Sequence, residues 1–452
     1  SIIAPNSVNY LLFLLSLSKK NGSAVNLNPN LSEIEIKERL ILGDVDYLIC
    51  TESIYSKLSE IIDETAIAKV IIIDSDTFKF KIVNEINLKP FEEKLIEKKS
   101  QIAFLQFTGG TSGVIKAAVI SHQNILENIT QINDHFQKYT SFNDFKVLVA
   151  FPFYHVFSIV FNVLFILNNG GTCFIYQDLR NTKLIIRLIK NNPINLTVGV
   201  NTWYNKLMQH EEFKALDLSK LKISLAGGEY VPLSTKQKWL HLTGKPLFSA
   251  YGLTETSSLS IISPFDETNL DDSIGIPVPS TEVVLFDENN NKINEDRIAG
   301  EIAMKGPQIT KAYYKNELET KTAFFGEWFK TGDIGERVDG HIYKIVDRKK
   351  DMISVSGNKV YPNEVESVIF KIEDVLDVGI VAKANEKSGE RVAACIVLKK
   401  DSQLTKDDIT NYCKNNLSSY KVPKNIYFYT ELPKTAIGKT ARRILKKEIN
   451  NG

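Results

Sequence analysis

Two kinds of hydrophobic pattern alternate along the first three-quarters of the chain. Short apolar runs bounded by turn residues predict buried strands, which we place at 70–73, 147–151, 172–176, 196–200 and 221–226. Helical patterns lie between them, at 124–136 behind a capping Ser121 and at 183–190 before Asn-Asn-Pro. This alternation predicts an α/β fold, with parallel sheets and helices packed on their faces.

The pattern changes twice in the remaining chain. From residue 281, T-E-V-V-L-F, E-N-N-N-K and G-E-I-A-M-K-G predict β-hairpins. A charge run, D-R-K-K-D, then begins at Asp347. The residues after it show helical patterns at 363–370 and 405–415 and strand patterns at 377–382 and 393–398. They predict a small α+β domain.

One stretch has the length of a membrane span, because residues 147–167 contain no Lys, Arg, Asp or Glu. Polar or helix-breaking residues interrupt it: Pro152, Tyr154, His155, Ser158 and Asn162. Hydrocarbon penalises unpaired polar groups, so we expect a buried strand, a polar loop and a buried helix instead.

Composition narrows the class of protein. The chain has 452 residues, 43% of them hydrophobic and 24% charged, with a net charge of +1. These values predict a soluble globular protein of several packed units and exclude a disordered, collagenous or disulfide-scaffold chain. A near-zero charge argues against nucleic acid as a partner. The opening S-I-I-A-P-N has no basic n-region, so we expect no signal peptide.

The four cysteines are far apart and form no CxxC pair. They are Cys50, Cys173, Cys395 and Cys413. This spacing fits neither a zinc site nor a disulfide framework, and it favours a reducing, cytoplasmic location.

The first candidate site is a loop rich in glycine and hydroxyl side chains, from Thr108 to Lys116. Glycine lets several backbone N–H groups approach an anion, and a lysine adds a cation, so the loop suits polyphosphate. It is not a Walker A loop, because Lys116 enters a β-like run instead of a helix. A plain turn is the alternative. The candidate ligands are Thr108, Thr111, Ser112, Gly113 and Lys116.

Two further loops follow strand-like segments. Y-G-L-T-E-T offers an aromatic ring for a purine, a hydroxyl for phosphate and Glu255 for Mg²⁺. A-G-G-E adds a second glycine-rich loop. Open α/β sheets bind ligands where such strands end, although each loop could also be an ordinary turn. The candidates are Gly227, Gly228, Glu229, Tyr251, Gly252, Thr254 and Glu255.

Four single residues complete the candidates. Asp333, in T-G-D, could accept both hydroxyls of a ribose, and Arg348 could reach the same sugar or a phosphate. Lys439 follows a glycine near the chain end, where the residues alone favour a basic helix start. His155, in P-F-Y-H-V-F, could equally be a core histidine.

Together, in this order and spacing, these segments resemble the adenylate-forming (acyl-activating) enzyme superfamily, and most nearly its bacterial long-chain fatty acid–CoA ligase branch. The resemblance runs from I-I-A-P-N to R-R-I-L and includes N-T-W-Y-N-K-L and S-I-G-I-P-V-P-S-T-E. It implies an acetyl-CoA synthetase-like fold. Residues 1–346 would form a large domain of αβ layers with a small β-barrel-like part, 347–350 a hinge, and 351–452 a small mobile α+β domain.

The resemblance also implies a two-step reaction. A carboxylate attacks the α-phosphate of Mg·ATP, and the CoA thiol then attacks the acyl-AMP. Thr108 and Glu255 would lie near Mg²⁺, and the loop from Thr108 would hold the β- and γ-phosphates. Gly228, Tyr251 and Gly252 would frame the adenine, whereas Asp333 and Arg348 would lie at the ribose and phosphates.

The remaining roles implied by the resemblance concern the acyl group and the moving domain. Lys439 would lie between the attacking carboxylate and the α-phosphate during adenylation. The small domain would then turn about Lys350, so that Ser356 and Gly357 line the thiol tunnel. His155 would lie at the carboxylate end of the acyl pocket, and residues 200–203 would line the acyl tunnel.

Two departures from the family pattern leave alternatives open. Ala117 follows Lys116 where the family has glycine, and the chain begins inside the family pattern. A catalytically impaired, truncated homologue is therefore one alternative. A fatty acyl-AMP ligase that loads a carrier protein, or a ligase for aryl or short acids, is another.

The expected partners are a long- or medium-chain fatty acid, ATP and CoA, with no nucleic acid. We also expect a cytoplasmic protein that associates peripherally with the inner face of the membrane and forms a homodimer.

Overall fold

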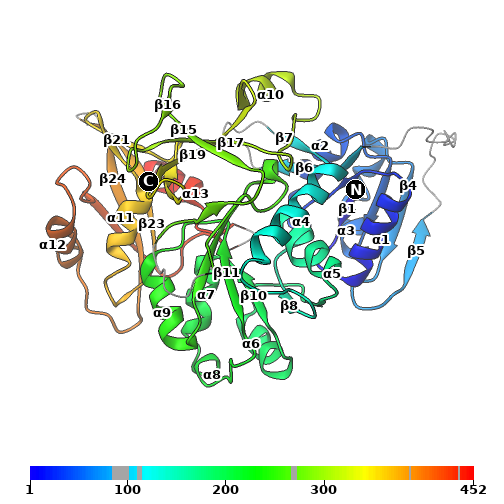
Figure 1. The fold of residues 1–452 in the computed structure, drawn as a ribbon, viewed down its shortest axis with the longest axis horizontal. Helices are drawn as coiled ribbons and strands as arrows, with labels where there is room; N and C mark the ends of the chain where they lie inside the picture. Colours follow the sequence, from blue (N-terminus) through cyan, green and yellow to red (C-terminus); the bar gives the residue numbers. More distant parts are fainter. Residues whose placement is uncertain (84–100, 109–114, 266–271, 386–387, 436–437, 452) are drawn as a thin grey trace.

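Strands and helices alternate through the larger part of the molecule, and a small α+β domain packs beside it (Figure 1). The computed structural model describes residues 1–83, 101–108, 115–265, 272–385, 388–435 and 438–451. The predicted fold class, a large N-terminal α/β domain followed by a small C-terminal one, is confirmed.

A central sheet has the strand order β14-β13-β12-β11-β10-β8-β9. Its five strands from β8 to β12 run parallel, and β13 and β14 are antiparallel at one edge. The strands span Lys146–Val149 (β8), Thr172–Ile175 (β9), Leu196–Gly199 (β10), Ile223–Gly227 (β11), Leu247–Tyr251 (β12), Ile261–Ile262 (β13) and Ile276–Pro277 (β14). Four of the predicted strands lie in this sheet, and three of them end one or two residues earlier than predicted.

Helices connect and cover these strands. They are α4 (His122–Phe136), α5 (Ile166–Asn168), α6 (Thr182–Asn191), α7 (Asn201–Met208), α8 (Glu211–Lys214) and α9 (Leu233–Thr243), with a short 3₁₀ turn, η3, at Thr254–Thr256. Ser121 caps α4 as predicted, by accepting the Asn124 backbone N–H while the Asn124 side chain accepts the Ser121 N–H.

The uncharged stretch after β8 forms a loop and then a π-helix, η2, at Ser158–Phe165. Its Phe161 and Phe165 rings stack on one another and pack on Phe136 of α4. The buried strand, loop and helix predicted for this stretch are therefore confirmed. Among the described residues, no helix is both long and apolar enough to cross a membrane. The four cysteines are free thiols.

Two smaller sheets lie toward the N-terminus, with orders β1-β3-β4-β5 and β2-β6-β7. Their strands span Ile2–Ile3 (β1), Ala24–Val25 (β2), Tyr47–Cys50 (β3), Lys69–Ile73 (β4), Phe80–Val83 (β5), Ile102–Thr108 (β6) and Lys116–Ser121 (β7). The helices here are α1 (Val8–Lys19), α2 (Glu33–Leu42), α3 (Glu52–Leu58) and the 3₁₀ turn η1 (Ile62–Glu64).

An antiparallel sheet follows, where the sequence predicts hairpins. It has the order β16-β15-β17-β19-β18, and β20 pairs with β19. The bounds are Glu282–Phe286 (β15), Lys292–Ile293 (β16), Gly300–Lys305 (β17), Phe324–Phe325 (β18), Trp328–Arg337 (β19) and Tyr343–Arg348 (β20), with α10 at Glu317–Ala323.

The small domain is a sheet, β22-β21-β24-β23 with β25 beside β24, covered by three helices. Val365 and Ile369 of α11 and Ile380 and Ile396 of the sheet belong to its buried core. The elements are β21 (Ile353–Val355), β22 (Asn358–Val360), α11 (Pro362–Ile369), β23 (Val375–Asn385), β24 (Gly389–Leu398), α12 (Lys406–Asn416), β25 (Asn425–Tyr429) and α13 (Arg442–Asn451).

Candidate active site

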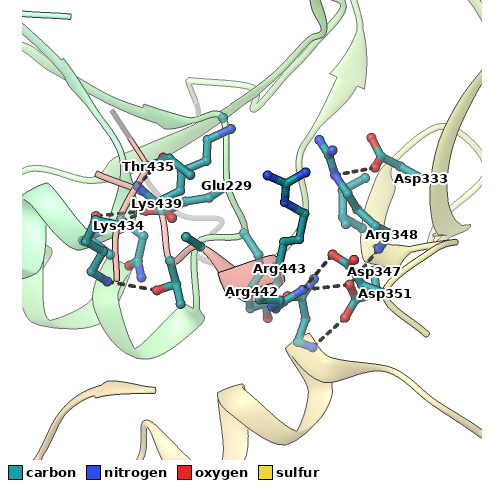
Figure 2. Close-up of a pocket in the computed structure, with 18 of the residues that line it drawn as sticks. Glu229, Asp333, Asp347, Arg348, Asp351, Lys434, Thr435, Lys439, Arg442 and Arg443 are labelled. Atoms are coloured by element: carbon teal, nitrogen blue, oxygen red, sulfur yellow. Dashed lines mark hydrogen bonds and ion pairs between the residues drawn. The ribbon is translucent and has the colours of Figure 1, made fainter. Parts of the chain in front are cut away.

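A cavity of about 870 Å³ lies between the carboxyl ends of the central strands and the small domain. Both parts of the chain contribute to its lining (Figure 2). Ten residues predicted from the sequence line it together: Thr108, His155, Gly228, Glu229, Tyr251, Gly252, Asp333, Arg348, Lys350 and Lys439. The loops after β11 and β12 and the strands β19 and β20 therefore converge with the loop that carries Lys439.

The Lys439 loop joins β25 to α13 and is held at both ends. At its base, the Ala441 N–H donates to the Pro433 carbonyl at 2.8 Å, and the Lys434 ammonium pairs with Asp377. At its tip, the Thr202 hydroxyl of α7 donates to the Gly438 carbonyl at 2.8 Å. This last bond fastens the small domain to the large one beside Lys439.

Lys439 passes closely over the backbone of Gly228. A Cβ atom on Gly228 would lie 3.3 Å from the Lys439 Cε atom, and the φ angle of +80° at Gly228 also disfavours a side chain there. Burial lowers the pKa of Lys439 to about 8, and the nearby positive charge of Arg348 adds to this effect. The ammonium therefore occupies a position where an anion would stabilise it.

Glu229 and Asp333 oppose that lowering of the Lys439 pKa through their negative charge. Glu229 accepts the Thr202 backbone N–H at 2.9 Å, and burial raises the pKa of its carboxyl group. Glu229 thus contributes to the electrostatics around Lys439 and to the fixing of α7.

Asp333, Tyr251 and Arg348 form a second group in the cavity. Antiparallel pairing of β19 and β20 sets Asp333 opposite Arg348, whose Nε atom lies 3.3 Å from the carboxylate. The Tyr251 hydroxyl donates to the other carboxylate oxygen at 2.7 Å. An ionised carboxylate can accept about four hydrogen bonds, so Asp333 keeps capacity for the two hydroxyls of a ribose.

His155 lies in the loop after β8, with its ring centroid 4.8 Å from that of Tyr154. Burial lowers the pKa of His155 to about 3, and the positive charge of Lys439 contributes to the shift. The imidazole is therefore neutral at physiological pH and can offer a hydrogen bond without adding a charge.

A buried hydroxyl and a buried carboxylate suit Mg²⁺. The Thr108 Oγ1 atom is buried and has no hydrogen-bond partner among the described residues. Glu255 is 9% exposed, and within the described part of the chain its carboxylate accepts one hydrogen bond, from the Tyr313 hydroxyl at 2.8 Å. Mg²⁺ prefers oxygen ligands and is commonly held by one or two carboxylates together with substrate phosphates. Within the described residues, no cluster of three or more His, Cys, Asp or Glu side chains could hold a metal by itself.

Several predicted residues do not line the cavity. Lys116 instead lies 3.0 Å from Glu319 and 4.1 Å from the centre of the Tyr313 ring. Gly227 is packed against β12, where a Cβ atom would meet the Ala250 carbonyl oxygen at 2.4 Å. The other residues outside the lining are Thr254 and Glu255 in η3 and the exposed Ser356 and Gly357 between β21 and β22. Thr111, Ser112 and Gly113 lie outside the described residues.

The sequence did not single out every residue that shapes the site. Thr202, expected only in an acyl tunnel, also bonds to the Lys439 loop, and Tyr313 joins Lys116 to Glu255. Arg442 and Arg443 line the cavity directly after that loop (Figure 2). The R-R pair three residues after Lys439 was visible in the sequence, but nothing there shows what each arginine faces.

Comparison with known proteins places this geometry in a family. The chain is 32% identical over 479 residues to a long-chain-fatty-acid–CoA ligase of Escherichia coli O6:H1, covering 99% of this chain and 85% of that protein. It is 30% identical over 481 residues to a long-chain-fatty-acid–CoA ligase of Bacillus subtilis, covering 100% of this chain and 86% of that one.

The fold is similar to a solved anthranilate CoA ligase, AuaEII, in complex with anthranoyl-AMP. The TM-score is 0.88 at 21% identity, over 100% of this chain and 87% of the other. The family description "AMP-binding enzyme" matches residues 1–314, and "AMP-binding enzyme C-terminal domain" matches residues 364–439. The chain therefore belongs to the AMP-binding enzyme family.

Proposed function

We propose that this protein joins a fatty acid to CoA in two steps at the cavity. In the first step, the fatty acid carboxylate attacks the α-phosphorus of ATP, and the bond to the leaving pyrophosphate breaks. In the second, the CoA sulfur attacks the acyl carbonyl and AMP leaves. The insertion of Lys439 into the cavity near Arg348 and Asp333 is the observation that carries the proposal.

The first step brings a carboxylate against the negatively charged triphosphate of ATP, so it needs cations aimed at the charge that develops. Lys439 supplies one such cation to the carboxylate and the α-phosphate. Asp333 and Arg348 hold the ribose and the phosphates, and Tyr251 lies beside the adenine. Thr108 and Glu255 would hold Mg²⁺, which when bound neutralises phosphate charge.

The acyl substrate is a long- or medium-chain fatty acid. The named relatives act on long chains, and the neutral His155 lies beside aromatic side chains, which disfavours a charged acyl group. For the second step we propose that residues 351–452 turn about a hinge at 347–350. Lys350 is exposed there, and the turn would bring Ser356 and Gly357 to the CoA thiol.

Pyrophosphate release with a fatty acid, measured with and without CoA, tests this function. A CoA ligase gives slow or single-turnover release without CoA and sustained release with it. An acyl-AMP ligase ignores CoA and turns over only when a carrier protein is added. No release with any acid of a chain-length series would identify an inactive homologue and contradict the proposal.

We further propose that the N-terminal region contacts a lipid surface. Helix α1 exposes Val8, Leu12 and Leu15 along one side, and β5 nearby exposes Phe80 and Ile82 (Figure 1). Exposed apolar patches of this kind commonly mark interaction surfaces. Flotation with anionic vesicles should retain the protein and lose the Leu12→Ser, Phe80→Ser double variant. Absence of flotation would contradict contact with a lipid surface. Concentration-dependent dimerisation that the double variant abolishes would instead assign the patch to a homodimer.

A further inference from the structure

The junction between the two domains contains a buried carboxylate, Asp347, to which the proposed chemistry gives no role. Asp347 lies on β20, and its backbone pairs with Ile334 of β19 in the large domain. Its side chain is 0% exposed. Asp347 is the first residue of the proposed hinge at 347–350, but its pairing with β19 keeps it with the large domain when the small domain turns about Lys350.

Asp347 nevertheless contacts the small domain. It accepts the Asn363 backbone N–H at 2.6 Å, at the start of α11, and lies 3.1 Å from the Arg442 guanidinium of α13 (Figure 2). The Asn363 side chain also donates to the Val346 carbonyl at 3.2 Å. These bonds cross the junction, so they form only in the domain orientation of this structure.

Arg442 connects this junction to Lys439. It begins α13 directly after Ala441, whose N–H closes the base of the Lys439 loop on Pro433. A fixed Arg442 therefore fixes the base of the loop, while the bond from Thr202 fixes its tip. The position of the Lys439 ammonium depends on both ends.

The small domain supplies its own partners for Arg442. The Glu366 carboxylate accepts two hydrogen bonds from it, at 3.1 and 2.7 Å, and Asp351 lies 3.6 Å away. Among the carboxylates that contact Arg442 in the described residues, Asp347 alone belongs to a large-domain strand. Glu366 thus holds Arg442 in every orientation, whereas Asp347 holds it in this one.

We propose that Asp347 is a positioning residue that, through Arg442, holds the small domain in the orientation that places Lys439 in the cavity. This inference rests on the proposed two-step function. Turning of the domain breaks the Asp347–Arg442 pair, so that Asp347 is hydrated instead while Arg442 keeps Glu366. The pair therefore favours adenylation over thioester formation through the orientation of the small domain.

Asp347→Asn tests the proposal, because an asparagine keeps the shape and the acceptor for Asn363 but removes the ion pair. We expect acyl-AMP formation to fall about tenfold, within the range of about 5- to 150-fold typical of coupling between distant sites. Thioester formation from supplied acyl-AMP should stay the same or rise. The decrease should be in kcat, with the KM for Mg·ATP nearly unchanged, since Asp347, although it borders the cavity, is fully buried and directs its carboxylate to Asn363 and Arg442.

Glu366→Gln is the matched control. It removes a negative charge from the same arginine inside the small domain, while the amide oxygen still accepts a hydrogen bond from Arg442 in both orientations. It should therefore lower the melting temperature and leave the ratio of the two half-reactions at the wild-type value. An equal fall of both half-reactions in folded Asp347→Asn would overturn the proposal. So would a tenfold rise in the KM for ATP, or the same change of ratio in Glu366→Gln.

A second measurement does not depend on activity. Lys238 of α9 and Lys414 of α12 are exposed, one in each domain. Fluorescent dyes attached at Lys238→Cys and Lys414→Cys would report the distance between the two domains by resonance energy transfer. Asp347→Asn should broaden or shift the distance distribution, and Glu366→Gln should not. If wild type releases no pyrophosphate, the proposed function fails. An Asp347→Asn distribution identical to that of wild type overturns the positioning role.

Discussion

Two lysines lie in different electrostatic settings: Lys116, which the loop pattern assigns to phosphate, and Lys439, which the family resemblance assigns to it. Lys439 reaches the cavity from the small domain and has no ion-pair partner among the described residues, and burial lowers its pKa to about 8. Lys116, at the start of β7 in the large domain, is paired with Glu319 and lies over the Tyr313 ring. Lys439 can therefore pair with an incoming anion directly, whereas Lys116 is already paired with the Glu319 carboxylate.

The difference suggests separate tasks for the two cations. An unpaired, buried ammonium is unfavourable until an anion arrives, so Lys439 contributes most where negative charge develops. Lys116 must exchange the Glu319 carboxylate for a phosphate, so its net contribution is the difference between two ion pairs. We expect Lys439 to affect the rate of adenylation and Lys116 to affect the binding of ATP.

Replacement of Lys439 should have the largest effect. We expect Lys439→Ala to lower the rate of acyl-AMP formation by about 10²–10³-fold, as for loss of one donor to a developing charge. Thioester formation from supplied acyl-AMP should largely survive. Both half-reactions should be measured on the same preparation, by pyrophosphate release and by loss of free CoA thiol. An equal decrease in both would contradict the assignment of Lys439 to the first step alone.

The pH profile tests the lowered pKa of Lys439. The charged form is present below about pH 8 and is lost as the pH rises through that value. The kcat/KM for adenylation, which reports the free enzyme, should therefore fall roughly tenfold per pH unit above it. His155, with a pKa of about 3, stays neutral over this range and cannot cause the decrease.

Lys439→Arg is the control for the pH profile, because arginine keeps its charge at all these pH values. It should react more slowly but lose the decline above pH 8. Measurement as pyrophosphate release without CoA removes the titration of the CoA thiol from the profile. A decline that persists in Lys439→Arg would assign the titration to another group.

Features that depend on local sequence patterns could be predicted without the structure. Residues at the ends of parallel strands, such as Gly228 and Tyr251, were selected from the sequence because strand ends meet at one edge of a sheet, and both line the cavity. The parallel strands and the capped α4 were also predictable, since both depend on local hydrophobic patterns and capping residues.

Contacts between distant segments were not predictable in this way. Lys116 and Glu319 are 203 residues apart, and Asp347 and Arg442 are 95 apart. Glu319 and Asp347 have ordinary local sequences, with Asp347 inside a charge run that would usually be solvated. Only the tertiary fold brings Lys116 to Glu319 and Arg442 to Asp347, and no local pattern encodes these long-range contacts.

The smallest expected effects come from the Lys116–Glu319 pair. Lys116→Met should raise the KM for Mg·ATP by roughly 2- to 30-fold, since a hydrogen bond to a charged group contributes about 1.5–3 kcal/mol and the Glu319 pair given up on binding offsets up to about 1 kcal/mol of it. Glu319→Gln should act in the opposite direction and lower that KM by about two- to fivefold, because a largely shielded but surface-accessible pair is worth up to about 1 kcal/mol. Initial rates over a range of Mg·ATP at saturating fatty acid measure both. If Glu319→Gln instead raises the KM as Lys116→Met does, Glu319 orients the Lys116 side chain toward ATP and does not compete with ATP for it. The two lysines would then differ in position, but not in whether a carboxylate opposes their binding of phosphate.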